Sequence, residues 1–595
     1  MQITDSRLGA SLLLAIVSAT ILLAGTASLP LLDRDEPRFA RATIEMLERG
    51  DWVVPYFNDE YRFDKPPLTY WLMAVGYATL GYGEAGARLH AVVAAIGMTL
   101  VVFLFGYRIV GPRRAFTAAF AWATCVQVFL HGRLAVADMP MILAVTAMHW
   151  ALWELLHENG GNRWRLALWG AAAAGFLAKG PIAIAVPAVT LLTLRLLGGR
   201  ASVAWRRLGA AWGLPLALAL VGAWGIPALL RTGGQFWDVG IGEHIVRRGV
   251  AAFNDRPIVP GYYLVTVLLS LFPWSPNLGQ IPVVLRRRWR EPRTRFLLGW
   301  VLGPFLIFSV YSTQLPHYTL PAFPALLLLL FQDGTDPSQF PPPSRRFYWF
   351  LHALVAILLL AVIGYAKWLD VPAQIRGLKV ALATLAGALL ALQGAAILYA
   401  RAGASGRQPL ADRGGGPMRV LALPGLVLTA AVATSMVATG IRPLAAPIRL
   451  LPYYAMVPPS ALHVATGYTE PSLVFYSNAF WQLNRSPTRA EIAAPGLFLY
   501  RGAELGLDRL FAPGADELRR RAVDACGTVA DGADAILPAD REKVAERARR
   551  AGVPAFVIDS DLSRAVVCGF NFARSTWSEL VVFYRESTPP PQDRQ

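Results

Sequence analysis

The chain has 595 residues, of which 55% are hydrophobic and only 16% are charged. A soluble protein carries about 25% charged residues, so this composition excludes an ordinary soluble enzyme of this length and indicates a membrane protein. The net charge of +17 does not indicate nucleic-acid binding, because the arginines lie mostly in short loops between apolar segments, where they set membrane orientation.

About thirteen apolar segments are long enough to cross a bilayer, for which about 20 residues suffice. The first, at 12–32, is longer than the apolar part of a cleaved signal peptide, so we expect an uncleaved helix. The other expected spans are 86–107, 115–131, 139–156, 166–179, 181–197, 208–230, 261–285, 296–312, 317–332, 347–368, 378–400 and 419–440.

Arginine-rich loops give the expected orientation. They alternate with acidic, aromatic and proline-rich loops, and the clearest of them is the block 286–290. Because arginine-rich loops stay in the cytoplasm, the other loops face outward. An odd number of spans then leaves the N-terminus inside. We therefore expect a transmembrane domain at 1–440, with a first outward loop at 33–83, and an outward soluble domain at 441–595.

The segment from 441 onward alternates strand-like and charge-rich helical runs, which predicts a small α/β domain. Cys526 and Cys568 both fall in this segment and can form a disulfide if the domain is extracytoplasmic. Cys125 lies in an apolar span, where we expect it to be a packing residue. The expected strands are 473–476, 497–500, 556–558 and 580–584, and the expected helix is 540–551.

The first outward loop concentrates charged side chains. Asp35 and Glu36, followed by Arg38, stand at the start of a helical stretch that we expect at 42–49, and Asp64 and Lys65 follow later in the loop. One interpretation is that the first two carboxylates stabilise a helix N-terminus, where acidic side chains are common. The other interpretation is that they belong to a functional site, and the sequence leaves both open.

Further ionisable side chains occur in four other outward loops or helix ends. We expect all of them on one membrane face, where charges are costly unless they pair or serve a site. Cations on such a face suit a lipid phosphate, and carboxylates can orient a sugar or activate a nucleophile. We expect the two histidines at 131 and 317 to be structural. The residues are His131, Arg133 and Asp138; Lys179; Glu243, His244, Arg247 and Arg248; and His317 and Tyr318.

Several sequence runs occur in a fixed order: DEPRFARATIEMLERGDWVVPYFNDEYRFDKPPLTYW, RLAVADMP, LAKGP, GEHIVRR and LPHYTLPAFPALLLL. Together they resemble the lipid A aminoarabinose transferase family of GT-C membrane glycosyltransferases, which is related to protein O-mannosyltransferases. The resemblance covers roughly the first 440 residues and leaves the tail unmatched. It implies a polytopic α-helical enzyme of a bacterial inner membrane with a periplasmic C-terminal domain. Such an enzyme moves 4-amino-4-deoxy-L-arabinose from undecaprenyl phosphate to lipid A phosphate.

The resemblance also implies roles for single residues. Asp35 matches the key aspartate of the family's first loop, Asp138 matches its partner, and Lys65 matches the lysine that meets the carrier phosphate. We expect the catalytic residues to be Asp35, Asp138, Lys65 and Arg38. The groups expected at the donor phosphate are Lys65, Lys179, Arg247, Arg248 and Tyr318, and those expected at the sugar or acceptor are Glu36 and Glu243.

Asp64 and His244 form a candidate site for a divalent metal. Many relatives have glutamate where this chain has Asp64, so the shorter side chain puts metal binding in question. A lone outward-facing histidine is more often a hydrogen-bonding residue than a metal ligand. The sequence therefore leaves the metal requirement open, and it indicates no other cofactor.

Sugar transfer from a lipid phosphate passes through an oxocarbenium-like centre while phosphate departs, and fixed cations stabilise that anion. If the acceptor is a phosphate, Asp35 orients the sugar; if it is a hydroxyl, Asp35 can act as general base. Two alternatives stay open, namely transfer of another polyprenyl-phosphate-linked sugar, including mannose to a protein hydroxyl, and transport of lipid-linked sugars. A transporter built from matched halves is disfavoured, because the sequence shows no internal repeat.

The arginine distribution predicts that Arg290 is cytoplasmic and Gly467 is extracytoplasmic. Compartment-sensitive reporters fused at these two positions should therefore report opposite sides of the membrane. Finding both reporters on one side would contradict the orientation, and the charged outward loops would then no longer share a face.

Overall fold

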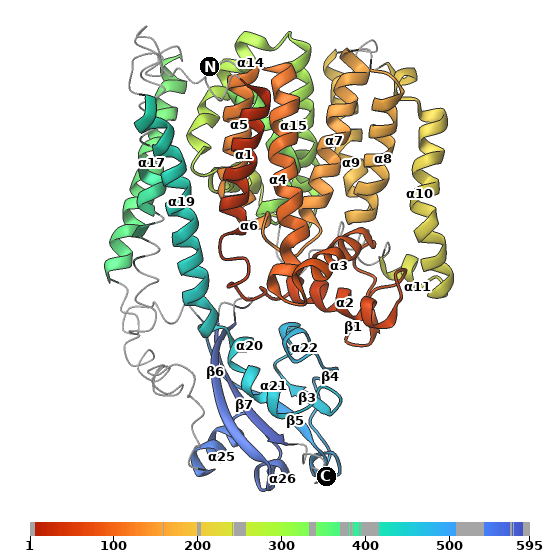
Figure 1. Ribbon diagram of the computed structural model, residues 1–595, viewed down its shortest axis with the longest axis vertical. Coiled ribbons are helices and arrows are strands. Elements are labelled where there is room, and N and C mark those ends of the chain that lie inside the picture. The colour runs from red at the N-terminus through yellow and green to blue at the C-terminus, as the bar shows by residue number, and fades with distance from the viewer. Residues whose placement is uncertain are drawn as a thin grey trace.

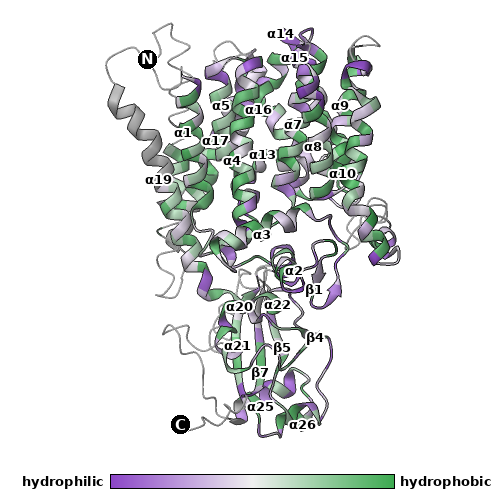
Figure 2. Ribbon diagram, turned by 45° about the vertical axis from the view of Figure 1, so that its right-hand side comes forward, coloured by the Kyte–Doolittle hydropathy of each residue, from purple (hydrophilic) through white to green (hydrophobic). Residues whose placement is uncertain are grey.

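A computed structural model shows a long helix bundle with a smaller domain, built around a sheet, at one end (Figure 1). Hydrophobic residues line the bundle helices, whereas the sheet domain is mixed in hydropathy (Figure 2). The described residues are 6–158, 160–198, 204–240, 242, 258–332, 341–368, 380, 383–384, 386–391, 394, 416–506, 541–571, 574 and 576–586.

Within the described part of the chain, five helices are long and apolar enough to cross a membrane, and four shorter apolar helices accompany them, which confirms a multi-pass membrane protein. The main bundle helices are α1 (Arg7–Leu23), α4 (Glu84–Ile109), α5 (Pro112–Thr124), α6 (Val126–His131), α7 (Asp138–His157), α8 (Asn162–Lys179), α9 (Ile182–Gly198), α10 (Ala210–Arg231), α13 (Tyr262–Ser270), α14 (Ile281–Arg288), α15 (Pro292–Val310), α16 (Phe323–Phe331), α17 (Pro342–Trp368) and α19 (Gly416–Ile441).

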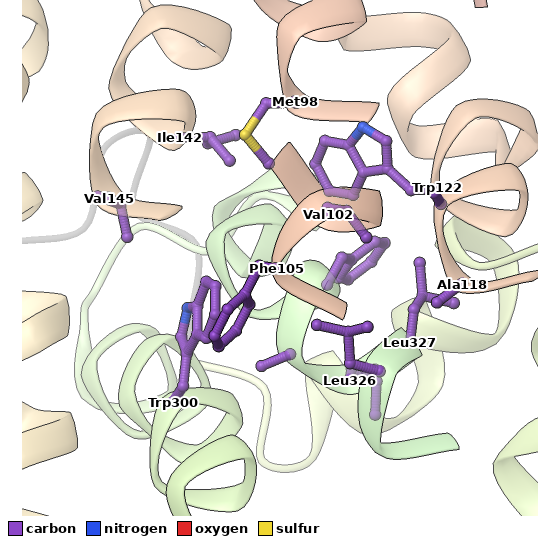
Figure 3. Close-up of a cluster of buried hydrophobic side chains, with 14 of the residues drawn as sticks. Met98, Val102, Phe105, Ala118, Trp122, Ile142, Val145, Trp300, Leu326 and Leu327 are labelled. Atoms are coloured by element: carbon purple, nitrogen blue, oxygen red, sulfur yellow. The ribbon is translucent and has the colours of Figure 1, made fainter. Parts of the chain in front are cut away.

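Helix α4 lies at the centre of the bundle, where it packs against α1, α5 and α7. Its residues Met98, Val102 and Phe105 are fully buried in the main hydrophobic core. Figure 3 shows this core, in which the Phe105 ring lies 6.3 Å from that of Trp300 on α15. Close packing of this kind fixes the positions of the helix ends that carry the polar residues.

The first helix ends earlier than the apolar pattern predicts, at Leu23 instead of residue 32. Gly25 leaves the helical conformation with a φ of +72°, and a Cβ there would lie 2.8 Å from Ala438 on α19. The apolar residues that follow form a turn whose backbone carbonyl groups, at Thr26, Leu29 and Pro30, accept hydrogen bonds from the guanidinium of Arg88.

The segment predicted as a polar first loop contains two helices. Helix α2 (Asp35–Arg49) is longer than the expected stretch, and α3 (Leu68–Leu80) is apolar but has only 13 residues. The sequence analysis missed α3, because a helix this short cannot span a bilayer. A small hairpin of β1 (Tyr56–Phe57) and β2 (Glu60–Tyr61) lies between the two helices.

Two predicted spans are broken instead of continuous. The span at 115–131 divides at Cys125, whose backbone is extended, into α5 and α6. The span at 261–285 divides into α13, the short 3-10 helix η5 (Ser275–Gln280) and α14, in a stretch that contains three prolines. Most of the span predicted at 378–400 lies outside the described residues.

The C-terminal part contains a five-stranded mixed sheet, which confirms the predicted α/β domain. The strand order is β4-β3-β5-β7-β6, with β3 parallel to β4 and β5 and the other pairs antiparallel. The strands are β3 (Leu462–Thr466), β4 (Trp481–Leu483), β5 (Gly496–Gly506), β6 (Ser563–Asn571) and β7 (Thr576–Arg585), and the accompanying helices are α20 (Ala446–Arg449), α21 (Leu451–Met456), α22 (Ser472–Ser477), α25 (Arg541–Arg550) and α26 (Ala555–Ile558).

Two of the four predicted strands in this domain are wrong. The runs at 473–476 and 556–558 are short helices, α22 and α26, because a short buried apolar run fits a helix as well as a strand. Cys568 lies on β6 and is disulfide-bonded, and Cys125 is buried and free. Cys526 lies outside the described residues, so its predicted pairing with Cys568 stays a prediction.

The sheet domain packs against the first loop of the bundle. The carboxylate of Asp33 accepts hydrogen bonds from the backbone N–H (2.9 Å) and the hydroxyl (2.7 Å) of Ser472 on α22. Asn58 exchanges two hydrogen bonds with the backbone of Trp481, at 2.8 and 2.9 Å. Helix α14, whose last turn contains three arginines, lies at the opposite end of the bundle (Figure 1).

Candidate active site

Asp35 is the first residue of α2, and its side chain is exposed. The residue that caps this helix is Arg34, and no side chain makes a capping hydrogen bond. The described residues provide Asp35 with no hydrogen-bond or ion-pair partner, although its charge acts on Arg38 and Arg62. Asp35 and Glu36 both lie in the first turn of α2, where carboxylates favour the helix N-terminus, but neither of them is the N-cap residue. The structure thus leaves the stabilising role possible, and it also places the Asp35 carboxylate at the surface of the first loop.

Glu36, the next residue, is 2% exposed and is engaged on both oxygens. Arg88 of α4 donates to it twice, at 2.8 and 2.7 Å. The backbone N–H groups of Leu32 and Ala135 donate to the same carboxylate, at 2.8 and 2.7 Å. We predicted that Glu36 contacts the sugar or the acceptor, but its buried carboxylate already accepts four hydrogen bonds from three residues of the protein. Glu36 instead joins α2 to α4 and to the turn before α7.

A first polar cluster lies at the end of the first loop and consists of Arg62, Asp64 and Lys65. The guanidinium of Arg62, which is 7% exposed, donates to the Tyr70 hydroxyl at 2.9 Å and pairs with Asp64 at 3.0 Å. The amino group of Lys65 donates to the carbonyl oxygen of Asp64 at 2.8 Å. Burial and the nearby charge of Arg62 lower the pKa of Arg38. Arg38 and Arg62 are thus the two arginines on which the charge of Asp35 acts, and Arg62 is itself paired with Asp64.

A second polar cluster joins residues that are far apart in the sequence. Lys179, at the end of α8, pairs with Asp138, at the start of α7, with 2.6 Å between Nζ and Oδ1. The ring of His317, in the 3-10 helix η6 (Pro316–Ala322), lies 3.9 Å from the same oxygen. Lys179 also lies 5.9 Å from the centre of the Tyr318 ring. The structure therefore brings together three predicted residues, Asp138, Lys179 and Tyr318.

His131 also belongs to this second cluster. Its ring stacks on that of His317 with 4.3 Å between centroids, and its Nδ1 lies 2.8 Å from Gln127. The hydroxyl of Ser270 donates to the other end of the same amide at 2.9 Å. We expected both histidines to be structural and did not predict that they lie beside the carboxylate of Asp138. The available signal was that each one stands at an outward helix end.

The two clusters lie at the same end of the bundle. The hydroxyl of Thr69, four residues after Lys65, donates to the carbonyl oxygen of Ala178 at 3.4 Å. This contact sets the start of α3 beside the end of α8, and Figure 1 shows α2 and α3 next to the ends of α7 and α8. Lys65, just before α3, and Lys179, the last residue of α8, thus stand on neighbouring elements.

Four predicted residues, Glu243, His244, Arg247 and Arg248, lie outside the described residues. The described part of the loop that contains these residues approaches the polar cluster of Arg62, Asp64 and Lys65. Phe236 on α11 (Gln235–Trp237) packs edge-on against Phe63 with 5.6 Å between ring centroids. A Cβ at Gly240 would lie 3.1 Å from the carbonyl oxygen of Phe63. This loop therefore reaches the residue that precedes Asp64.

The predicted metal site at Asp64 and His244 stays untested, because His244 is not described. A metal bound to Asp64 would have to compete with the guanidinium of Arg62, which already neutralises this carboxylate. Among the described residues, no group of three or more His, Cys, Asp or Glu side chains is arranged to hold a metal ion.

Comparison with known proteins confirms the resemblance. Residues 64–226 match the family model described as dolichyl-phosphate-mannose-protein mannosyltransferase. The undecaprenyl phosphate-alpha-4-amino-4-deoxy-L-arabinose arabinosyl transferase of Edwardsiella ictaluri is 34% identical over 307 residues, which are 50% of this chain and 54% of that protein. The enzyme of the same name from Aeromonas hydrophila is 32% identical over 360 residues, 57% of this chain and 63% of that protein. The chain thus spans little more than half the length of these relatives.

The fold has a counterpart among solved structures. The crystal structure of ArnT from Cupriavidus metallidurans bound to undecaprenyl phosphate has a TM-score of 0.66 at 20% identity, covering 84% of this chain and 93% of that chain. The same enzyme in the apo state has a TM-score of 0.67. This likeness confirms the predicted GT-C type fold.

The Glu36–Arg88 contact predicts that Glu36→Gln lowers the stability of the protein. The substitution removes the negative charge and leaves Arg88 as an unpaired buried cation, which costs about 3 kcal/mol. Thermal unfolding of the purified protein should show a clear drop in Tm. The matched control is Asp35→Asn, one residue away, which removes a charge without an ion-pair partner among the described residues and should leave Tm unchanged. An unchanged Tm for Glu36→Gln would refute the structural role.

Proposed function

We propose that this protein is a membrane glycosyltransferase that moves 4-amino-4-deoxy-L-arabinose from undecaprenyl phosphate to a lipid A phosphate. The observation that carries the proposal is the meeting of the first-loop residues with the Asp138–Lys179 pair at one end of the bundle. The names of the similar proteins supply the sugar and the carrier.

Two observations support a location of the candidate site at the periplasmic face of a bacterial inner membrane. The sheet domain and both polar clusters lie at one end of the bundle, and the arginine-rich end of α14 lies at the other (Figure 1). Arginine-rich loops face the cytoplasm, so the clusters face outward. Both lipids are anchored in the bilayer, and their headgroups can therefore reach this end.

The departing carrier phosphate requires cations that are already in position. Lys65 and Lys179 stand on adjoining elements. The ion pair with Asp138 holds the amino group of Lys179 beside the Tyr318 ring. An ammonium held in place stabilises negative charge as the bond to the sugar breaks, without reorganisation at that moment. Lys65 and Lys179 therefore bind and stabilise the leaving phosphate.

Asp35 binds and orients the sugar of the donor. Its exposed carboxylate is available to an amino group of the donor, because the described residues do not pair with it. A phosphate acceptor is already anionic and needs little base catalysis, so Asp35 orients the sugar instead of removing a proton. Arg38 and Arg62 lie near Asp35 and reduce the repulsion between two phosphates that approach each other.

A second candidate function is transfer of another polyprenyl-phosphate-linked sugar, including mannose, to a protein hydroxyl. The match of residues 64–226 to the protein mannosyltransferase model favours this alternative. In such a reaction Asp35 would act as a general base toward the hydroxyl group. A panel of donors and acceptors offered to the purified protein distinguishes the two functions.

Mass spectrometry of lipid A tests the proposal directly. A strain that makes undecaprenyl-phosphate-linked aminoarabinose but lacks its own transferase should gain aminoarabinose-modified lipid A when this chain is expressed. The Asp35→Asn variant, expressed to the same level, is the negative control. Unmodified lipid A in cells that hold both substrates and the inserted wild-type protein would contradict the proposal.

The proposed phosphate contact predicts that Lys65→Ala slows transfer severely. Loss of one charge-assisted contact costs a few kcal/mol, and each 1.4 kcal/mol corresponds to about tenfold in rate, so the expected loss is about a hundredfold. In vitro transfer from the purified carrier-linked sugar measures the rate. Arg231→Ala is the control, because this exposed arginine at the same end pairs with Asp51 and should leave the rate unchanged. A normal rate for Lys65→Ala would remove Lys65 from the site.

The role of Asp35 predicts that Asp35→Asn abolishes most transfer while the protein still inserts and folds. Asparagine keeps the shape and can cap a helix, so a capping residue would tolerate the change with nearly normal activity. The same transfer assay measures the outcome, and Glu60→Gln, an exposed carboxylate in the same loop, is the control. Full activity of Asp35→Asn would mean that the site is centred on Asp138.

A further inference from the structure

Arg133 is a buried arginine without a hydrogen-bond acceptor. It lies in the turn between α6 and α7, and only 6% of it is exposed. No described residue accepts a hydrogen bond from its guanidinium, and one terminal nitrogen, Nη2, is fully buried in this state. The group lies over the Phe129 ring, 4.8 Å from the ring centroid.

The other strongly buried arginines of this region are satisfied. Arg88 donates to the Glu36 carboxylate and to three backbone carbonyl groups. Arg41 pairs with Glu45 at 3.1 Å, and Arg62 pairs with Asp64 at 3.0 Å. Arg133 differs from all three, so the missing acceptor is a property of this site and not of buried arginines in this protein.

The charges around Arg133 do not compensate it. Its charged neighbours are Arg88, which repels it, and Glu36, which attracts it but is already engaged with Arg88 and two backbone N–H groups. Burial and the charge of Arg88 lower the pKa of Arg133 to about 10. A buried cation in this condition is costly, and such residues in membrane proteins usually serve a ligand or a pathway.

Packing holds this arginine in place beside the candidate active site. A Cβ at Gly132 would lie 2.6 Å from the carbonyl oxygen of Val128 and 2.9 Å from the side chain of Leu22, so the turn fits tightly against α6 and α1. His131 and Asp138, at the two ends of the same short segment, belong to the cluster around Lys179. Arg133 is therefore a fixed cation on the segment that builds this cluster.

We propose that Arg133 binds the phosphate of a lipid substrate, a contact that rests on the proposed function and extends it. Guanidinium donors arranged as a fork match the geometry of phosphate oxygens and favour two parallel hydrogen bonds. The phosphate comes either from the undecaprenyl carrier or from lipid A. When the phosphate binds, its oxygens accept the hydrogen bonds for which the described residues provide no acceptor. Because the buried charge of Arg133 is stabilised only by an anion, this contact favours lipids with an anionic headgroup.

The test is Arg133→Met in the full chain, purified in detergent or nanodiscs, with thermal unfolding and lipid binding as readouts. Methionine keeps length and apolar contact but removes the charge. Because Arg133 is uncompensated without lipid, the lipid-free Tm of the variant should equal or exceed that of the wild type. Titration with undecaprenyl phosphate and, separately, with lipid A should show at least tenfold weaker binding of one of them, and the affected lipid identifies the source of the phosphate.

Controls keep this outcome distinct from general damage and from failure of the proposed function. Arg108→Met is the matched control, because Arg108 pairs with Glu154 near the other end of α4 and should leave both affinities unchanged. A lower lipid-free Tm with unchanged binding of both lipids would show a purely structural arginine and overturn the proposal. If the methionine variant does not fold, Arg133→Lys replaces it, and unchanged affinities for both lipids in that variant would overturn the proposal equally. Binding needs no turnover, so absence of transfer by the wild type would contradict only the proposed function.

Discussion

The buried ion pair between Glu36 and Arg88 holds together the parts of the chain that carry the candidate site. One carboxylate joins four segments: the turn after α1, α2 itself, α4, and the turn before α7. Asp35 is the neighbour of this carboxylate, and Asp138 follows Ala135 by three residues. In a poorly hydrated interior, breaking such a pair costs far more than a surface ion pair contributes, so the pair fixes both aspartates in place.

Around Glu36, buried charges that are paired within the protein differ from charges that are not, whereas Lys179 in the candidate site is itself paired with Asp138. Glu36, Arg88 and Arg41 use their polar atoms within the protein and carry the architecture. Asp35, at the surface, and Arg133, which is buried over the Phe129 ring, have no hydrogen-bond or ion-pair partner among the described residues. Because unpaired charge is expensive near a membrane, its retention points to substrates that bring the opposite charge.

The sequence predicted a multi-pass helical membrane protein correctly, because length and hydropathy decide which segments can cross a bilayer, but it did not predict the breaks within two of the expected spans. It failed where local pattern is ambiguous, as in the early end of α1, the short apolar helix α3, and the helix α22 that looked like a strand. It did not show that Glu36 is buried, because the arginine that pairs with this residue lies 52 positions away in the sequence. Motif resemblance selected Asp138 and Lys179, but only the fold shows that they pair.

If the proposed function is right, Lys65 and Lys179 bind one phosphate at the junction of α3 and α8. A cryo-electron microscopy structure of the full chain with undecaprenyl phosphate tests it most directly. We predict headgroup density at the outward end of the bundle, in contact with the amino groups of both lysines. A phosphate bound elsewhere, with both lysines retaining only their protein contacts, would contradict this account.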